Sequence, residues 1–417
     1  MNGQRYMIKR SSGSEAVQGA GLSRSLGLGL LVFYGLGVII GAGVYVVIGD
    51  VIEKAGALAV CSFAVAGALA GLTALSYAEL GARHPEAAGA AAYVKEAFGS
   101  DRFSQLTGFA VAVVVLISAA TIARGTAGYA QVFVALPEAL IAGVVVLLFT
   151  AVACLGVKDS VRAAAVMTII ELAGLMLVVS AGLAQVRDLH GQALALVPTD
   201  LDAWIRICAG AFLAFFAFTG FENLANMAEE AKNVGRTLPR AILLSLGIST
   251  VIYMTVTLVV VAAVPLDEAA SSAAPLLSVI ERRGWGISNA FAALALVAVA
   301  NGVLIQILML SRLFYGMARR SLLPSGLAAI SPRHVPVRAT LVAGALVLLS
   351  TIALSFEALL RLSTTLTLLV FALVSLSLWR LQQSAPRQDL DFYVPRWVPI
   401  AAALGSIGLI AAQFAFA

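Results

Sequence analysis

Charged side chains are scarce in this sequence. Asp, Glu, Lys and Arg make up 12% of the 417 residues, whereas 61% are hydrophobic. Soluble globular chains carry about 25% charged residues, so this composition cannot cover a surface that faces water. It excludes a soluble enzyme and a disordered chain, and it indicates that most of the outside faces lipid. The cations behind the net charge of +5 are spread thinly between apolar runs, so we expect no nucleic-acid partner.

Cysteine and histidine are also rare, with three of each. Cys61, Cys154 and Cys208 lie in apolar segments without a CxxC pair, so the sequence predicts neither a disulfide framework nor a zinc site. The histidines are far apart along the chain, and we expect no metal site and no cofactor.

Long apolar runs, in contrast, are abundant. A helix that spans a bilayer needs about 20 mostly apolar residues, and eleven runs meet this requirement. They lie near 27–49, 56–80, 103–125, 138–156, 163–185, 204–231, 241–264, 287–315, 338–355, 359–380 and 397–416. We therefore predict an all-α integral membrane protein with about eleven transmembrane helices. Residues 1–25 would form a polar N-terminal tail, and residues 26–417 a single transmembrane domain.

Lys and Arg are distributed unevenly between the predicted loops. With the N-terminus in the cytoplasm, twenty of the 27 cations lie on the cytoplasmic side and six on the other. This asymmetry follows the positive-inside rule, and eleven spans then place the C-terminus outside. Arg124 remains, near the end of the third span, and we expect it to snorkel to the headgroups. The alanine-rich, Arg-over-Lys composition and the lack of organelle signals indicate a bacterial inner membrane.

Two spans are interrupted at matching positions in the two halves of the chain. The first contains Gly41-Ala42-Gly43 at its middle, and the sixth contains Gly220 followed by Glu222. Paired interruptions five spans apart are typical of transporters built from inverted repeats, with the binding site at the breaks. The alternative is that the glycines only allow close helix packing. An acid at membrane depth, however, is costly and usually functional.

The predicted breaks expose backbone groups without helical partners. Amides at the start of the outer half of the first span would bind an anion, and carbonyls at both breaks would bind a cation. The amides are those of Ala42, Gly43 and Val44. The carbonyls are those of Ile39, Ile40, Phe216 and Ala217. A zwitterion with one carboxylate and one ammonium group would fit both sets.

Four segments carry a family resemblance. They are Gly37-Val-Ile-Ile-Gly-Ala-Gly-Val-Tyr45, Leu75-Ser-Tyr-Ala-Glu-Leu-Gly81, Phe215-Phe-Ala-Phe-Thr-Gly-Phe-Glu222, and Tyr315-Gly-Met-Ala-Arg-Arg320 with Leu323-Pro324. In this order they resemble the motifs of the amino acid–polyamine–organocation (APC) superfamily of transporters, and the resemblance covers nearly the whole chain.

The resemblance implies a five-plus-five inverted repeat, the leucine-transporter-like fold, which works by alternating access. Repeat one would cover about 27–185 and repeat two about 204–380, with an extra helix at about 397–416. Members commonly have twelve spans, which leaves a dimer contact by a last helix open, so the protein is a monomer or a homodimer.

The resemblance also implies roles for residues at the breaks. Ala42 and Gly43 would bind the substrate carboxylate, and Phe216 or Phe218 would act as a gate. The amine would meet backbone oxygens of Ile39, Phe216, Ala217 and Thr219. Gly41, Gly220 and Tyr45 complete the predicted set.

Glu171, in the fifth span, is the first candidate for ion coupling. Some proton-coupled members carry a lysine at this spacing. A protonatable Glu171 would load and release a proton, whereas an ionised Glu171 would help to hold a sodium ion. The structural alternative is a neutral acid hydrogen-bonded to a neighbouring helix. Glu222 is the second candidate, for gating or coupling, and its structural alternative is a cap on freed amides. Asn301, in the eighth span, would hydrogen-bond near the cavity.

The leading hypothesis is a proton-coupled secondary transporter of amino acids. The sequence has no GxxxxGKS/T loop, which argues against ATP-driven transport. Small, apolar and aromatic residues near the breaks favour neutral substrates. Three alternatives stay open: an obligate amino acid exchanger, a transporter of cationic amino acids or polyamines, and an intramembrane enzyme that uses Glu171 and Glu222 as an acid pair.

Overall fold

The computed structural model describes residues 26–41, 43–84, 89–155, 160–183, 196–225, 227–228, 231–332, 335–384 and 391–415, with only the backbone for 160–165. These residues are mainly helical and contain no strand beyond a single parallel bridge between Leu26 and Ala231.

The first and sixth spans are each made of pieces. The first consists of α1 (Leu28–Ile40) and α2 (Gly43–Ala55). The sixth consists of α9 (Leu201–Ala214), the 3₁₀ turn η2 (Phe215–Phe218) and α10 (Glu222–Ala225). The other spans are α3 (Ala59–Arg83), α5 (Asp101–Ala130), α6 (Glu138–Leu155), α7 (Ser160–Leu183), α11 (Val234–Ala263), α14 (Ser288–Arg319), α15 (Val337–Ala353), α16 (Phe356–Ser384) and α17 (Trp397–Ala415).

Short helices lie in the connections. They are η1 (Gly56–Leu58), α4 (Gly89–Phe98), α12 (Leu266–Ser271), α13 (Pro275–Arg283) and η4 (Ser325–Ala328). The last lies between α14 and α15.

Within the described ranges, nine helical stretches are long and apolar enough to cross a membrane, and α1 and α15 are shorter apolar helices. One of the nine, Gly43–Arg83, contains both α2 and α3. All eleven predicted segments are therefore helical, and the prediction of an all-α membrane protein is confirmed. Some bounds shift. The first span extends to Ala55, and the seventh begins at Val234 with Pro239 in its second turn.

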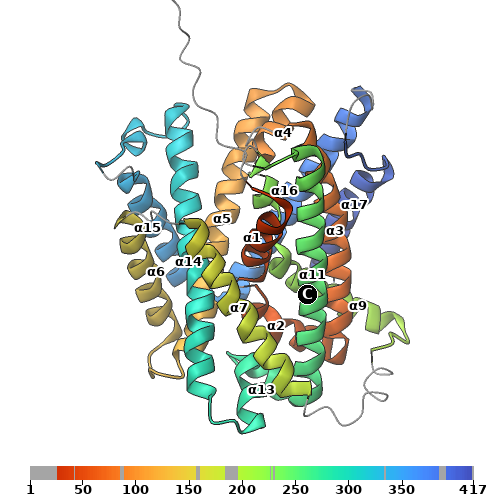
Figure 1. Ribbon diagram of the computed structural model, residues 1–417, viewed down its shortest axis with the longest axis vertical. Helices are drawn as coiled ribbons and strands as arrows, with labels where there is room; N and C mark the ends of the chain where they lie inside the picture. The colour runs from red at the N-terminus through yellow and green to blue at the C-terminus, as the bar shows by residue number, and fades with distance from the viewer. Residues whose placement is uncertain are drawn as a thin grey trace, which may run out of the picture.

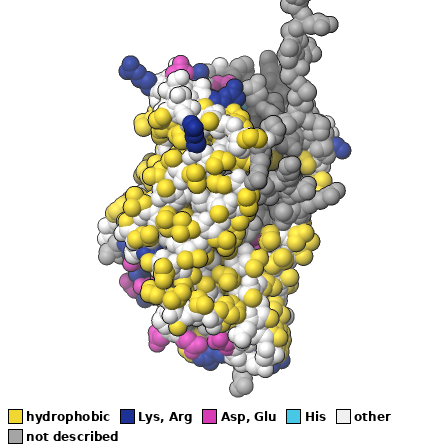
Figure 2. Space-filling view, turned by 90° about the vertical axis from the view of Figure 1, so that its left-hand side faces the viewer, with side chains coloured by type: hydrophobic (Ala, Val, Ile, Leu, Met, Phe, Trp, Pro, Cys, Tyr) yellow, Lys and Arg dark blue, Asp and Glu magenta, His cyan; other side chains and the backbone are white. Residues whose placement is uncertain are grey.

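The broken first span lies at the centre of the molecule (Figure 1). Its inner piece α1 packs against α11 and α7, while α3 packs along α11 and α5 along α14. α6 and α15 form an outer edge of the helical bundle. α4 and α13 lie at opposite ends of the molecule, which we call the α4 end and the α13 end. Figure 2 shows that the face around this edge is largely hydrophobic between charged margins, as expected for a lipid-facing surface.

Arg124 does not reach the lipid headgroups, so the snorkelling prediction is wrong. Its side chain is only 12% exposed. Nε donates to the carbonyl of Thr351 at 2.8 Å, and Nη2 donates to that of Leu354 at 3.0 Å. Nη1 lies 3.4 Å from a carboxylate oxygen of Glu138. The guanidinium satisfies carbonyls that the end of α15 leaves without helical partners, and it ties α5 to α15 and α6.

Glu79 forms a second buried connection, at the α4 end. One carboxylate oxygen accepts from Arg83, and the other accepts from the Gln382 amide at 2.9 Å and from the Val394 backbone at 2.8 Å. The Glu79 side chain has no exposed surface. It therefore joins α3 to the end of α16 and to the segment that leads into α17.

Candidate functional site

The first span breaks where the sequence predicts. α1 ends at Ile40, Gly41 has non-helical backbone angles (φ −19°, ψ −116°), and α2 begins at Gly43. Ala42, to which the sequence analysis assigns a carboxylate contact, lies outside the described residues. The α2 amides start a new helix here, so they have no helical acceptors of their own.

The sixth span breaks over a longer stretch. α9 tightens into η2, Thr219 is extended, and Gly220 has a φ of +119°, in the region that favours glycine. The carbonyl of Phe216 accepts from the Thr219 amide at 3.2 Å and from its hydroxyl at 2.7 Å.

The two breaks interlock through their glycines. A Cβ atom on Gly43 would lie 2.6 Å from Cα of Ala217, and one on Gly220 would lie 2.7 Å from the carbonyl oxygen of Val38. Each broken span thus presses a glycine against the backbone of the other. The packing role that the sequence analysis gives as an alternative is real for both glycines, alongside any binding role.

Tyr253 of α11 joins the two breaks. Its hydroxyl oxygen lies 2.7 Å from the carbonyl oxygen of Ile39 and 3.0 Å from that of Ala217, so its one proton serves both. In this conformation the two predicted carbonyls therefore have a side-chain donor from another helix. Leaving buried carbonyls unpaired is costly, and the phenol removes that cost. The sequence analysis missed this residue. The sequence feature that could have indicated it is a single tyrosine within an apolar span, since a buried tyrosine hydroxyl usually has a hydrogen-bond partner.

A cavity of about 80 Å³ lies between the breaks. Eight of the predicted site residues line it: Ile39, Gly41, Gly43, Phe216, Thr219, Gly220, Glu171 and Glu222. The rest of the wall comes mainly from α5 and α14, which contribute Val114, Val115, Ser118, Ile122, Asn301, Ile305, Gln306 and Met309. Ile40, Val44, Tyr45, Ala217 and Phe218 are buried beside the cavity but do not line it.

The structure separates the two candidate gating phenylalanines. Phe216 lies in the cavity wall. The Phe218 ring instead packs edge-on against Tyr253 and Phe63, at centroid distances of 5.2 and 6.4 Å. Of the pair, only Phe216 is placed to cover a substrate. Tyr45 is also fully buried, and its hydroxyl donates to the backbone carbonyl of Glu171 at 2.8 Å.

Glu171 points from α7 towards the first break. Its side chain is 1% exposed, and Oε1 lies 3.9 Å from the Cβ position of Gly41. The Asn301 side chain interacts with this carboxyl group, which agrees with the predicted place of Asn301 at the cavity. Oε2 has no hydrogen-bond partner among the described residues. The side chain that lines the cavity therefore carries an acidic oxygen with spare bonding capacity.

Glu222 caps its own break. Its Oε2 accepts from the amide of Gly220 at 2.8 Å, as expected of a carboxylate near freed amides at a helix start. This contact supports the structural alternative for Glu222. Since Glu222 also lines the cavity, its predicted role in gating or coupling stays a prediction.

The walls of the cavity differ in their exposure. Tyr45, Tyr129 and Phe218, near the breaks, have no exposed surface. On α14, the lining residue Ile305 is 37% exposed. The part of the lining that reaches the surface of the described structure thus lies on α14.

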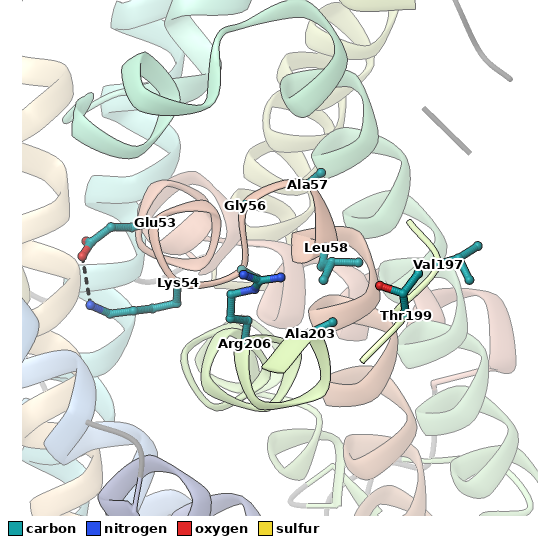
Figure 3. A pocket seen from close by; sticks show the side chains of 10 residues that line it. Glu53, Lys54, Gly56, Ala57, Leu58, Val197, Thr199, Ala203 and Arg206 are labelled. Carbon is teal, nitrogen blue, oxygen red and sulfur yellow. Dashed lines mark hydrogen bonds and ion pairs between the residues drawn. The ribbon is translucent and has the colours of Figure 1, made fainter. Parts of the chain in front are cut away.

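A larger hollow of about 540 Å³ lies at the α13 end, away from the breaks (Figure 3). It is bounded by η1, the end of α2, the start of α9 and the segment before α9. Lys54 is paired with Glu53 there at 2.9 Å, and Arg206 with Asp202 at 3.0 Å. Both cations among its described lining residues thus have acidic partners.

Comparison with known proteins identifies the family. The family model for amino acid permeases matches residues 26–417. The chain belongs to the amino acid permease family. It is an amino acid transporter of the APC superfamily and a multi-pass membrane protein, so the alternative of an intramembrane enzyme is discarded.

Relatives of this permease are named for different substrates. The branched-chain amino acid permease BcaP of Lactococcus lactis subsp. cremoris is 28% identical over 384 residues, which cover 85% of this chain and 81% of the relative. The human cationic amino acid transporter 4 is 30% identical and is matched over 80% of this chain and 56% of its own length. The Arabidopsis thaliana cationic amino acid transporter 9 is 30% identical, with 68% and 53% covered. The chain spans little more than half of these last two proteins.

Proposed function

We propose that this permease carries neutral amino acids with apolar side chains by alternating access. The observation that carries the proposal is the composition of one cavity. Residues of both breaks meet there, and the wall formed by α5 and α14 is mainly apolar: it contains Val114, Val115, Ile122, Ile305 and Met309 beside the polar Ser118, Asn301 and Gln306. The described lining includes no Lys or Arg, so a second carboxylate on the substrate would lack a partner.

Uptake competition tests this proposal. Uptake of labelled leucine would be measured in liposomes that contain the purified permease. Unlabelled valine, isoleucine, lysine, arginine or glutamate would be added outside as the competitor. We expect the two branched neutral amino acids to inhibit uptake most strongly. Strong inhibition by glutamate would contradict the proposed site. The name of the Lactococcus lactis relative supports the same substrate class.

Cationic amino acids are the second candidate. The unpartnered oxygen of Glu171 is placed to accept from an ammonium or guanidinium group, and the human and plant relatives are named for cationic substrates. If lysine is the substrate, Glu171→Gln should abolish lysine uptake and spare any uptake of leucine. Equal loss of both would point to coupling instead.

We further propose that a proton couples transport through Glu171. Its carboxyl group touches both the first break and the cavity, so protonation and substrate binding would share one site. A sodium ion held by the same carboxylate is the alternative, and an obligate exchanger needs neither ion. An imposed pH gradient should drive accumulation in sodium-free liposomes. Accumulation that requires sodium, or counterflow without gradient-driven uptake, would contradict proton coupling.

The proposed setting is a bacterial inner membrane, with the N-terminus in the cytoplasm and the C-terminus, after eleven spans, outside. In this orientation the α4 end faces the cytoplasm, and we expect the cavity to open to that side. The protein would be a monomer or a homodimer.

A further inference from the structure

The part of the chain between residues 284 and 356 has an unusual charge content. It contains five arginines (Arg312, Arg319, Arg320, Arg333 and Arg338) and no acidic residue. This segment forms α14, η4 and α15. Arg312, Arg319 and Arg320 lie in or just after the last turns of α14, and Arg338 lies in the first turn of α15. The positive charge therefore gathers at the α4 end and has no negative partner within the segment.

Arg312 and Arg338 flank one helix crossing. The hydroxyl groups of Ser311 and Thr340 hydrogen-bond across it at 2.7 Å. Nη1 of Arg338 lies 3.6 Å from the Cβ position of Gly326, so η4 borders the same spot. Both arginines are exposed. Two exposed arginines from neighbouring helices thus lie within two residues of one hydrogen-bonded helix contact.

These arginines have no acidic partner among the described residues, unlike several other arginines of the structure. Ion pairs join Arg83, Arg206, Arg236, Arg282 and Arg361 to carboxylates. Neither Arg312 nor Arg338 forms an ion pair with a described residue, and the same holds for Arg319, which lies over the ring of Tyr315. The guanidinium groups remain able to bind an external anion.

The helix lengths place the two arginines at headgroup depth. α14 has 32 residues, about 48 Å at 1.5 Å per residue, and exceeds the hydrocarbon thickness of about 30 Å. α15 has only 17 residues, about 26 Å, so its first turn cannot lie far beyond the hydrocarbon edge. Figure 2 shows Lys and Arg side chains at the upper margin of the apolar face on this side. Leu341, one turn from Arg338, is 53% exposed and offers an acyl chain an apolar contact.

We propose that Arg312 and Arg338 bind the phosphate headgroup of an anionic phospholipid in the leaflet at the α4 end. A guanidinium group matches phosphate through two parallel hydrogen bonds, and anionic lipids attract cations at the membrane surface. Met309, one turn before Arg312, lines the substrate cavity. A lipid bound here would therefore hold the part of α14 that borders the opening of the cavity.

The test is a binding measurement and does not depend on the substrate proposal. Purified permease in phosphatidylcholine nanodiscs would be titrated with phosphatidylglycerol, with retained lipid counted by native mass spectrometry and unfolding followed by heating. In the double variant Arg312→Gln with Arg338→Gln, we expect phosphatidylglycerol to bind about 30-fold more weakly, which corresponds to about 1 kcal/mol at each arginine. Replacing both arginines with lysine keeps the charge but loses the paired hydrogen bonds, and should give an intermediate loss.

The matched control is Arg102→Gln with Arg240→Gln. It removes two exposed arginines at the same end, on α5 and α11, and should leave the affinity near that of the unchanged protein. If both double variants bound phosphatidylglycerol equally weakly, the effect would be one of general surface charge, and the proposed site would be wrong. Unchanged affinity in Arg312→Gln with Arg338→Gln would overturn it too. So would equal stabilisation by inorganic phosphate, since the site would then select a soluble anion.

Discussion

At the scale of single residues, the hydroxyl of Tyr253 lies where the two broken spans meet. It occupies the carbonyls of Ile39 and Ala217, which a substrate ammonium group would need. In the empty cavity it keeps two buried acceptors satisfied. A substrate must therefore displace or share this hydroxyl, and binding exchanges one set of hydrogen bonds for another.

Tyr253→Phe should lower the unfolding temperature of the empty protein, because it leaves buried carbonyls unpaired at about 1–3 kcal/mol. Saturating substrate should raise the unfolding temperature of the variant by more than it raises that of the unchanged protein, because the substrate's ammonium group supplies the missing donor. Thermal unfolding with and without substrate measures both effects.

Tyr129→Phe is the control. Tyr129 is equally buried, but its hydroxyl donates to the carbonyl of Tyr45 at 3.0 Å, away from the cavity lining. Substrate should not give this variant an extra gain. If both variants respond alike, Tyr253 is a structural residue only.

Glu171→Gln should remove the dependence of uptake on pH. The amide keeps the size of the side chain and its contact with Asn301 but cannot release a proton. We expect uptake by the unchanged protein to rise as the pH outside falls from about 8 to 5, and the variant to give a flat profile. Glu357→Gln, at an exposed site on α16, serves as control. A profile unchanged in Glu171→Gln would transfer coupling to Glu222 or elsewhere.

At the scale of helices, the two breaks form one mechanical unit through Gly43 and Gly220. Gly220→Ala should destabilise the fold, because Gly220 has a φ of +119° and its Cβ position meets the Val38 carbonyl at 2.7 Å. The backbone strain alone amounts to about 1–3 kcal/mol. Thermal unfolding would show a clear drop, together with loss of uptake.

Gly247→Ala provides the comparison. Gly247 lies in α11 with no atom within 4 Å of its Cβ position, so alanine there should be neutral or slightly stabilising. A normal unfolding temperature in Gly220→Ala would show that the contact between the breaks is loose.

The Glu79 connection gives a second prediction for helices. Glu79→Gln removes the charge that pairs with Arg83, whose side chain is 8% exposed. Leaving a buried cation unpaired costs about 3–5 kcal/mol, so the unfolding temperature should fall strongly. Asp202→Asn disrupts a pair with the same spacing of four residues on the exposed start of α9, and it should cause no measurable change. Similar small effects in both variants would mean that Glu79 does not hold α3 to α16 and α17.

At the scale of the whole molecule, the sequence predicts the architecture but not the contacts across it. Apolar runs gave the spans, and glycine at 41, 43 and 220 gave the breaks, because these properties are local. Tyr253 and Ile39 are 214 positions apart, and Arg124 and Thr351 are 227 apart. The sequence around Tyr253 or Arg124 does not indicate such a distant partner. For the same reason the sequence does not reveal the donor that a distant helix supplies to the carbonyls of Ile39 and Ala217.

The orientation and the opening of the cavity can be tested together. In a protein with Cys61, Cys154 and Cys208 replaced, a cysteine introduced by Gln306→Cys should react with an impermeant maleimide in inside-out vesicles. One introduced by Thr199→Cys, at the α13 end, should react in right-side-out vesicles. Saturating substrate should slow only the first reaction. The reverse pattern would contradict a cytoplasmic N-terminus, and a Gln306→Cys protein that reacts in neither preparation would contradict an open α4 end.

The contacts of Gly43 with Ala217 and of Gly220 with Val38 also limit which positions can be substituted to alter substrate specificity. A larger side chain at either glycine would collide with the backbone of the other broken span. Substitution there should therefore abolish transport rather than change the substrate. Val114 and Ile122 of α5 and Met309 of α14 face the same space from helices that run unbroken. Directed evolution towards larger or smaller amino acids should therefore accumulate its changes on those two helices and leave the glycines untouched.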